Sequence, residues 1–160
     1  MSLHRDLITE ARKRVRATKP SEAALRRAVS DLYYAVFHAI GSEIARPYPV
    51  AIRAGAKRML DHNKAKSMAN KIKGQQTLPA WSPSTKCPAL LLPVASNFCE
   101  LQEARHVADY DERIAHTRNE VVALIDRAAA TIDALELART QCPDELYAFV
   151  LSLLFDKWAK

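Results

Sequence analysis

Apolar residues recur three or four positions apart through most of the chain, which is the spacing of one face of an α-helix. The clearest example runs from Ala24 to Gly41. Its apolar stripe consists of Leu25, Val29, Leu32, Val36 and Ile40. We therefore expect a long central helix that packs one face against a core and around which the other helices are arranged.

A second, polar stripe follows the same helix and carries Arg27, Asp31, Tyr34 and His38. One interpretation is a solvated face with an Arg27–Asp31 ion pair, which would contribute little stability. The tyrosines and the histidine favour a face that contacts something other than water, because aromatic rings are rarely exposed over a whole turn. Both interpretations remain open at this point.

The same periodicity predicts further helices on both sides of the central one. The expected segments are residues 2–18 and 50–73, one that begins near 88, residues 118–139, and a last one that begins at 142–145. We expect a break near 61–63 and a bend at Pro93. Ser21 is a natural N-cap for the central helix, and Thr117 with Glu120 forms the pattern of a capping box.

Some of these segments carry expectations about burial. In residues 50–73, the side chains expected to face inward are Ile52, Ala56, Met59, Leu60, Met68 and Ile72. In the last helix, the expected apolar face consists of Leu146, Phe149, Val150, Leu153, Leu154 and Trp158. Residues 74–88 contain three prolines and little periodicity, so we expect a loop. Its Trp81 either folds back on the core, which is the more common case, or marks a contact surface. With no strand candidate, the sequence predicts an all-α fold of four to six helices.

A length of 160 residues allows one domain with a real core rather than two. Three Gly and 49% hydrophobic residues argue against disorder and against a turn-rich all-β fold. The longest apolar run, residues 88–95, is too short to span a membrane, and the N-terminal residues lack the hydrophobic core of a signal peptide. Cys87, Cys99 and Cys142 lack C-x-x-C or zinc spacing, so we expect reduced thiols. We expect one cytoplasmic domain over residues 1–160.

The net charge of +6 is divided unevenly along the chain. Residues 1–73 hold 16 Lys and Arg against 6 Asp and Glu, whereas residues 74–160 hold 8 against 12. Such asymmetry indicates a basic surface that faces a polyanion, or else helices that carry solubilising charge. Residues 50–73 are the most basic part, and without a glycine-rich phosphate loop they support only electrostatic attraction to a phosphate backbone.

Arg105 is the residue most clearly placed for chemistry. It shares one helical face with Val94, Phe98 and Leu101, so its guanidinium is expected to point inward. An inward arginine needs partners, which Asp109, Tyr110 or the polar stripe of the central helix could supply. We therefore expect a polar cluster around Arg105.

The histidines divide into two groups. His4 and His62 lie among charged residues and are expected on the surface, which leaves His38, His106 and His116 as candidates. The sequence contains neither a zinc pattern nor a nucleophile elbow. Asp109 and Asp111 stand two apart, but two carboxylates without a third ligand favour capping or pairing over metal binding. We expect no metal and no cofactor.

The chain resembles the HEPN superfamily of prokaryotic helical domains in two segments, RRAVSDLYYAVFHAI at 26–40 and FCELQEARHVADYD at 98–111. The resemblance implies an up-and-down bundle of four or five helices that usually dimerises, with a cleft between protomers. Many members are metal-independent endoribonucleases of toxin–antitoxin and phage-defence systems. Others are partners of minimal nucleotidyltransferases or have no demonstrated catalysis.

The ribonuclease signature of that superfamily is an arginine followed, after four to six residues, by a histidine. Arg105 matches the arginine, but Tyr110 stands where the histidine is expected. The resemblance therefore implies a modified site, whose candidate catalytic residues are Arg105, Tyr110, His106 and Asp109. The candidate residues for binding RNA or phosphate are Arg27, Tyr34, His38, Arg53, Lys57, Arg58 and Lys64.

Two classes of function follow. The protein is either an RNA-directed HEPN protein or a non-catalytic helical dimer that binds another protein, such as a nucleotidyltransferase or an antitoxin. In the second case the Arg105 cluster is a buried group of polar side chains that satisfy one another and serve only the structure. The central and last helices carry more apolar surface than a small bundle can bury, so we expect a twofold homodimer in either case.

Overall fold

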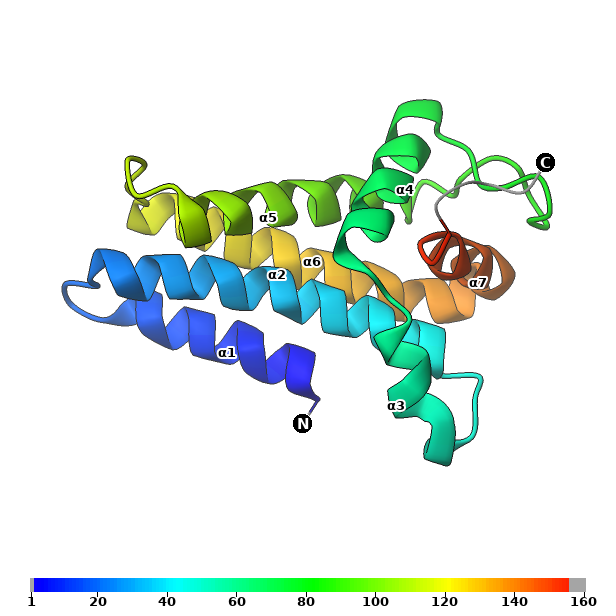
Figure 1. Cartoon of the computed structure of the whole chain (residues 1–160), viewed down its shortest axis with the longest axis horizontal. Coiled ribbons are helices and arrows are strands. Elements are labelled where there is room, and N and C mark those ends of the chain that lie inside the picture. The colour runs from blue at the N-terminus through cyan, green and yellow to red at the C-terminus, as the bar shows by residue number, and fades with distance from the viewer. Residues whose placement is uncertain (1, 156–160) are drawn as a thin grey trace.

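The computed structural model describes residues 2–155, and within this range the chain is all-α, as expected. Its seven helices exceed the expected four to six (Figure 1). They are α1 (Leu3–Arg16), α2 (Glu22–Ala45), α3 (Val50–Arg58), α4 (His62–Gln75), α5 (Leu92–Tyr110), α6 (Arg118–Gln141) and α7 (Pro143–Ser152). None of the described helices is both long and apolar enough to cross a membrane.

The prediction of a central helix is confirmed by α2. It packs on α1, α5 and α6, which run alongside it, and on the shorter α3 and α7 (Figure 1). All five residues of its apolar stripe are buried. Ser21 caps it as predicted, because its Oγ accepts a hydrogen bond from the Ala24 amide at 3.1 Å. The stripe is buried by neighbours on several sides and lies at the centre of the core.

The expected burial of residues 50–73 holds only for the second half of that segment. Leu60, Met68 and Ile72 are buried, but Ile52 is 53% exposed and Met59 64%, so their inward orientation was wrongly predicted. Nine-residue α3 packs mainly on the end of α2, and one neighbouring helix cannot cover it. The break is where the sequence places it, since the Asp61 side chain caps α4 through the amides of residues 63 and 64.

The segment before α5 also differs from expectation. The helix begins at Leu92, and Pro93 lies in its first turn, where its missing N–H needs no partner; the expected start near Pro88 and the bend at Pro93 were therefore wrong. The preceding loop includes an isolated bridge between Thr77 and Lys86. Trp81 is 46% exposed, so of the two alternatives the structure does not support the one in which it folds back on the core.

The C-terminal part follows the sequence more closely. The capping box of α6 is confirmed, because Thr117 Oγ1 accepts from the Glu120 amide and the Glu120 carboxylate accepts from the Thr117 amide. The predicted apolar face of α7 is buried at Leu146, Phe149 and Val150. Trp158, the last expected member of this face, lies outside the described residues.

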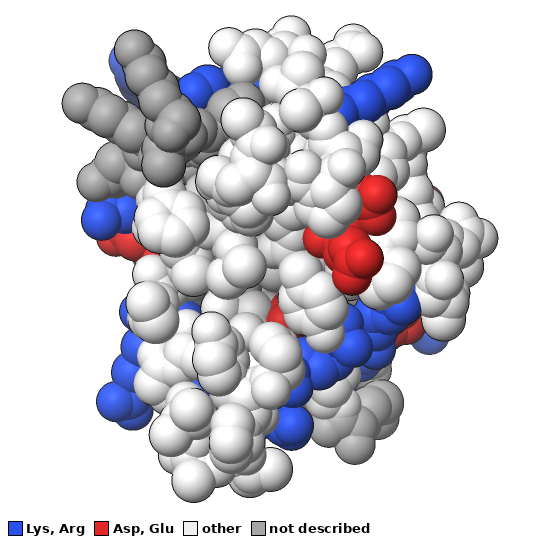
Figure 2. Space-filling view, turned by 90° about the vertical axis from the view of Figure 1, so that its right-hand side faces the viewer, with Lys and Arg blue, Asp and Glu red and all other residues white. Residues whose placement is uncertain are grey.

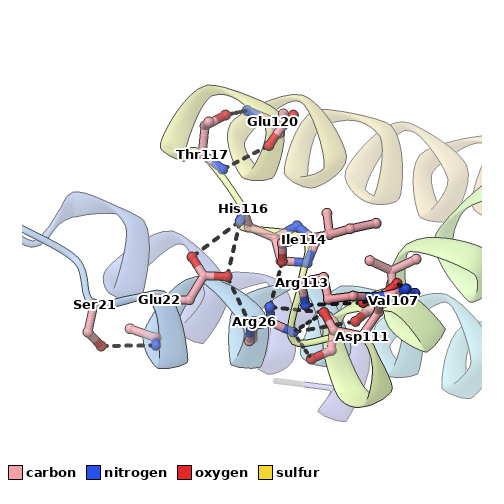
Figure 3. Close-up of polar contacts among 12 residues, drawn as sticks. Ser21, Glu22, Arg26, Val107, Asp111, Arg113, Ile114, His116, Thr117 and Glu120 are labelled. Carbon is pink, nitrogen blue, oxygen red and sulfur yellow. Dashed lines mark hydrogen bonds and ion pairs between the residues drawn. The ribbon is translucent and has the colours of Figure 1, made fainter.

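Arg26 of α2 joins the central helix to the end of α5 and the following turn (Figure 3). Its guanidinium donates to four backbone carbonyls, those of Val107 (3.4 Å), Ala108 (2.9 Å), Asp111 (3.1 Å) and Ile114 (2.5 Å). The last carbonyls of a helix have no intrahelical donor, so Arg26 satisfies the Ala108 carbonyl, which would otherwise need water, and adds a second donor to the Val107 carbonyl, which also accepts from the Asp111 amide. Arg26 therefore fixes the backbone on both sides of Tyr110.

Candidate functional site

Arg105 lies between α5 and α2, as its place on the apolar stripe of α5 predicts. Its guanidinium carbon is 5.5 Å from the ring centroid of Tyr33 and 5.3 Å from that of Tyr34. Its Nε donates to the Asp109 carboxylate at 2.8 Å, and 20% of the side chain is exposed. Within residues 2–155, Asp109 is the only hydrogen-bond partner of Arg105. The guanidinium is thus held by one carboxylate and two aromatic faces, and part of it stays open to solvent.

His62 belongs to this cluster, contrary to the prediction that it lies on the surface. Its Nδ1 is 2.5 Å from the hydroxyl oxygen of Tyr33, and its ring stacks on Phe37 with the centroids 4.1 Å apart. The Gln102 amide nitrogen donates to its backbone carbonyl at 3.1 Å. Because Asp61 caps α4, the first residue of that helix is turned onto the aromatic side of α2. The charged residues beside His62 in the sequence do not indicate its contact with Tyr33, which lies 29 residues away.

The surroundings of His62 favour the uncharged ring. Burial lowers its pKa, and the positive charge of Arg105 lowers the pKa further, against a smaller opposing effect of Asp61. Burial also raises the pKa of the Tyr33 hydroxyl, which therefore remains protonated. At neutral pH the site thus combines a fixed cation with a neutral imidazole and a buried hydroxyl group.

A cavity of about 480 Å³ opens beside this cluster. The residues that line it are His62, Asn63, Lys66, Gln102, Arg105, His106 and Tyr110. A second cavity of about 410 Å³ shares His106 and Tyr110 and continues along the end of α5. A third, of about 500 Å³, lies where α4 ends and α5 begins; Lys73 is its one charged residue, and it does not reach the cluster.

Several of the predicted site residues meet around Arg105. Asp109 pairs with it, Tyr34 lies under it, and His106 and Tyr110 line its cavity. The ring centroid of His38 is 6.3 Å from that of Tyr34, so this histidine lies at the edge of the cluster.

Arg27 does not join the site. It pairs with Asp31 at 3.2 Å, and Asp31 also accepts from Arg14 of α1 at 3.3 Å. Because Asp31 is only 3% exposed, the expected solvated pair is part of the contact between α1 and α2.

The predicted basic residues are split between two helices. Arg53, Lys57 and Arg58 are exposed on α3, and Arg53 donates to the backbone carbonyl of Tyr48 at 2.8 Å. Lys64 is exposed in the first turn of α4, two residues from Lys66, which lines the cavity. Among the lysines of α4, Lys66 is therefore the one that lines the cavity beside Arg105, and the basic residues of α3 do not line it.

The other predicted groups take structural positions. Asp109 pairs with Arg105, and Asp111 pairs with Arg113 at 3.0 Å. Among residues 2–155, no group of three His, Cys, Asp or Glu side chains could hold a metal ion. His4 is buried, with a ring nitrogen 2.9 Å from Ser2 Oγ, so its predicted place on the surface was wrong.

Comparisons of the chain with family models, with curated proteins and with solved structures gave no significant match. The function of the site therefore has to be argued from its own geometry. That geometry combines an arginine with open donors, a lysine at the same cavity and a neutral histidine, which is a set suited to an anionic ligand.

Proposed function

We propose that this protein is a HEPN-like helical protein that binds RNA and holds one of its phosphate groups in the cavity beside Arg105. The observation that carries the proposal is the arrangement of Arg105, which lines the cavity while only its Nε is engaged by a carboxylate. A guanidinium binds phosphate through two parallel N–H groups, and the terminal nitrogens of Arg105 are not committed to any described residue.

Lys66 strengthens the site as an anion site. It lines the same cavity, and its ion pair with Glu103, at 3.4 Å, involves a carboxylate side chain that is 65% exposed. Such a surface pair contributes little, so a phosphate can compete for the ammonium group. The positive balance of residues 1–73 adds a long-range attraction for a polyanion.

Metal-independent cleavage of the RNA is a second candidate function, which the place of His62 favours. In the tautomer whose Nδ1–H donates to the Tyr33 oxygen, Nε2 is free to accept the proton of a ribose 2′-hydroxyl. That oxygen then attacks the adjacent phosphorus, the bond to the 5′-oxygen breaks, and the leaving oxygen takes a proton from water. Arg105 would neutralise the charge that develops on the phosphate, so cleavage should persist in EDTA.

A homodimer, or a complex with a nucleotidyltransferase or an antitoxin, fits the exposed apolar side chains of α3 and of Met59, the residue that follows it. Val50 is 77% exposed, and Ile52 and Met59 are more than half exposed. Figure 2 shows the side of the molecule that bears α3 and α7, on which uncharged side chains predominate. If protein binding were the whole function, Arg105 would serve only to hold α5 against α2.

The test compares Arg105→Ala with Arg12→Ala by the fluorescence anisotropy of a labelled single-stranded RNA. Arg12 is an exposed arginine of α1, a helix that packs on α2 and α6, so it controls for the loss of one charge. We expect Arg105→Ala to weaken binding at least tenfold and Arg12→Ala to weaken it about twofold. Equal effects of the two changes, or no RNA binding by the wild type, would overturn the proposal.

A further inference from the structure

The rings of His106 and Tyr110 stand together at the end of α5, between the two cavities. Their centroids are 5.0 Å apart with the planes inclined by 49°, and both residues line both cavities. With 68% of its surface exposed, Tyr110 is the most exposed Tyr, Trp or Phe among residues 2–155. The ring is therefore not placed there to fill the core.

The backbone under this pair is held firmly although the rings are exposed. Arg26 donates to the carbonyls of Val107 and Ala108 before Tyr110 and to that of Asp111 after it (Figure 3). The backbone is thus tied to α2 two and three residues before Tyr110 and one residue after it. An aromatic side chain presented on a fixed backbone loses little further entropy when a ligand stacks on it.

We propose that Tyr110 and His106 form a stacking platform for one unpaired nucleobase, whose neighbouring phosphate lies at Arg105. The inference rests on the proposed function, because it uses the same cavity for the phosphate. Every nucleobase has a π-face, so stacking on a tyrosine tolerates any sequence, but a base inside a duplex is already stacked and cannot reach the ring. The ligand is therefore single-stranded RNA.

The charges of the second cavity agree with a base rather than another phosphate. Asp111 and Glu112 line it with two carboxylates, and the one guanidinium there, that of Arg113, is paired with Asp111 at 3.0 Å. A phosphate would be repelled, whereas the N–H groups of a base can donate to carboxylate oxygens. The RNA strand would place its phosphate in the cavity beside Arg105. Its base would lie on the Tyr110 ring or in the second cavity.

The experiment measures the anisotropy of a labelled single-stranded RNA with Tyr110→Ala and Tyr110→Phe, using as competitors an abasic oligomer with the same number of phosphates and an RNA duplex. We expect Tyr110→Ala to weaken binding about tenfold and Tyr110→Phe to retain it, because stacking needs the ring and not the hydroxyl. On the wild type, the abasic oligomer should compete less well than an unlabelled RNA, because it offers no base to the ring. Its own affinity should be the same for the wild type and for Tyr110→Ala. Melting temperatures of the variants should equal that of the wild type, since the ring is exposed.

Two outcomes separate the failure of this inference from that of the proposed function. If Arg105→Ala loses RNA binding while Tyr110→Ala keeps it, or if the duplex or abasic oligomer competes as well as the single strand, the platform is wrong and the phosphate site stands. If neither Arg105→Ala nor Tyr110→Ala changes binding, both are overturned.

Discussion

Arg26 and Arg105 are almost equally buried, with 18% and 20% of their side chains exposed, but their partners differ in kind. Arg26 donates to four backbone carbonyls and to the carboxylate of Glu22. Arg105 donates to one carboxylate four residues away and otherwise faces two tyrosine rings. Burial alone therefore does not tell a structural arginine from a binding one.

The difference lies in what each guanidinium could exchange. The acceptors of Arg26 belong to the end of α5 and its following turn, so losing them would loosen the backbone. The acceptor of Arg105 is a partly exposed carboxylate that water can solvate, and both partners of that pair lie on the same helix. A phosphate can replace water at Arg105 without disturbing the fold. At Arg26 it would have to displace the backbone carbonyls through which Arg26 holds the end of α5.

The largest expected effect is on stability. Arg26→Ala leaves several carbonyls without their charged donor and should lower the free energy of unfolding by about 3 kcal/mol. Arg105→Ala removes one partly exposed ion pair and the contact with two rings, and should lower it by only about 1–2 kcal/mol. Urea unfolding of both variants, with Arg12→Ala as the control, measures the difference. If the Arg105→Ala protein were as unstable as Arg26→Ala, the role of Arg105 would be to stabilise the fold and not to bind a ligand.

A second prediction concerns the pH dependence of stability. Because the pKa of His62 is lowered in the folded protein, mainly by burial and then by Arg105, the unfolded chain takes up the proton first as the pH falls. The contribution of His62 is therefore fully present above the ordinary histidine pKa, about 6.5, and is lost as the pH falls through the lower folded value. His4 and His38, whose pKa values burial also lowers, act in the same direction.

The variant His62→Asn isolates this contribution. Its free energy of unfolding should decrease less than that of the wild type between about pH 7.5 and pH 5.5. Urea unfolding at the two pH values gives the comparison within each protein, so the loss of the Tyr33 contact cancels. An unchanged pH dependence would show that His62 titrates as freely in the folded protein as in the unfolded chain.

The smallest expected effect is on RNA binding, and it distinguishes the basic residues of α4 from those of α3. Lys66→Glu places a carboxylate at the cavity and should weaken RNA binding severalfold, whereas Arg58→Glu, on exposed α3, should weaken it about twofold or less at physiological salt. Anisotropy titrations at low and moderate salt measure both changes. Should Arg58→Glu have the larger effect, the RNA would lie along α3 and not at Arg105.

The parts of the molecule that the sequence predicts well are those that depend on near neighbours. The caps at Ser21 and Thr117 and the stripe of α2 follow from spacings of three or four residues. The inward turn of Arg105 could be predicted for the same reason, since its register with Phe98 and Leu101 fixes its side of the helix. These features survive in the fold because local geometry determines them.

The missed features depend on contacts between distant segments. His62 reaches Tyr33 across 29 residues, and its charged sequence neighbours indicate the opposite environment. The partners of Arg26 are backbone carbonyls 81–88 residues away, which side-chain patterns do not show. The exposure of Ile52 was missed because periodicity shows that a helix has an apolar face but not whether a neighbour covers it.

The most direct test of a phosphate site at Arg105 is nitrogen-15 NMR of the arginine side chains during titration with a single-stranded RNA. The Nε–H signals of Arg105 and Arg26 are assigned from the Arg105→Lys and Arg26→Lys variants. We predict that the Arg105 signal shifts and saturates with the RNA while the Arg26 signal stays in place, because of these two guanidinium groups that of Arg105 has terminal nitrogens not engaged by any described residue. An Arg105 signal that does not move while the protein becomes saturated with RNA would contradict this account.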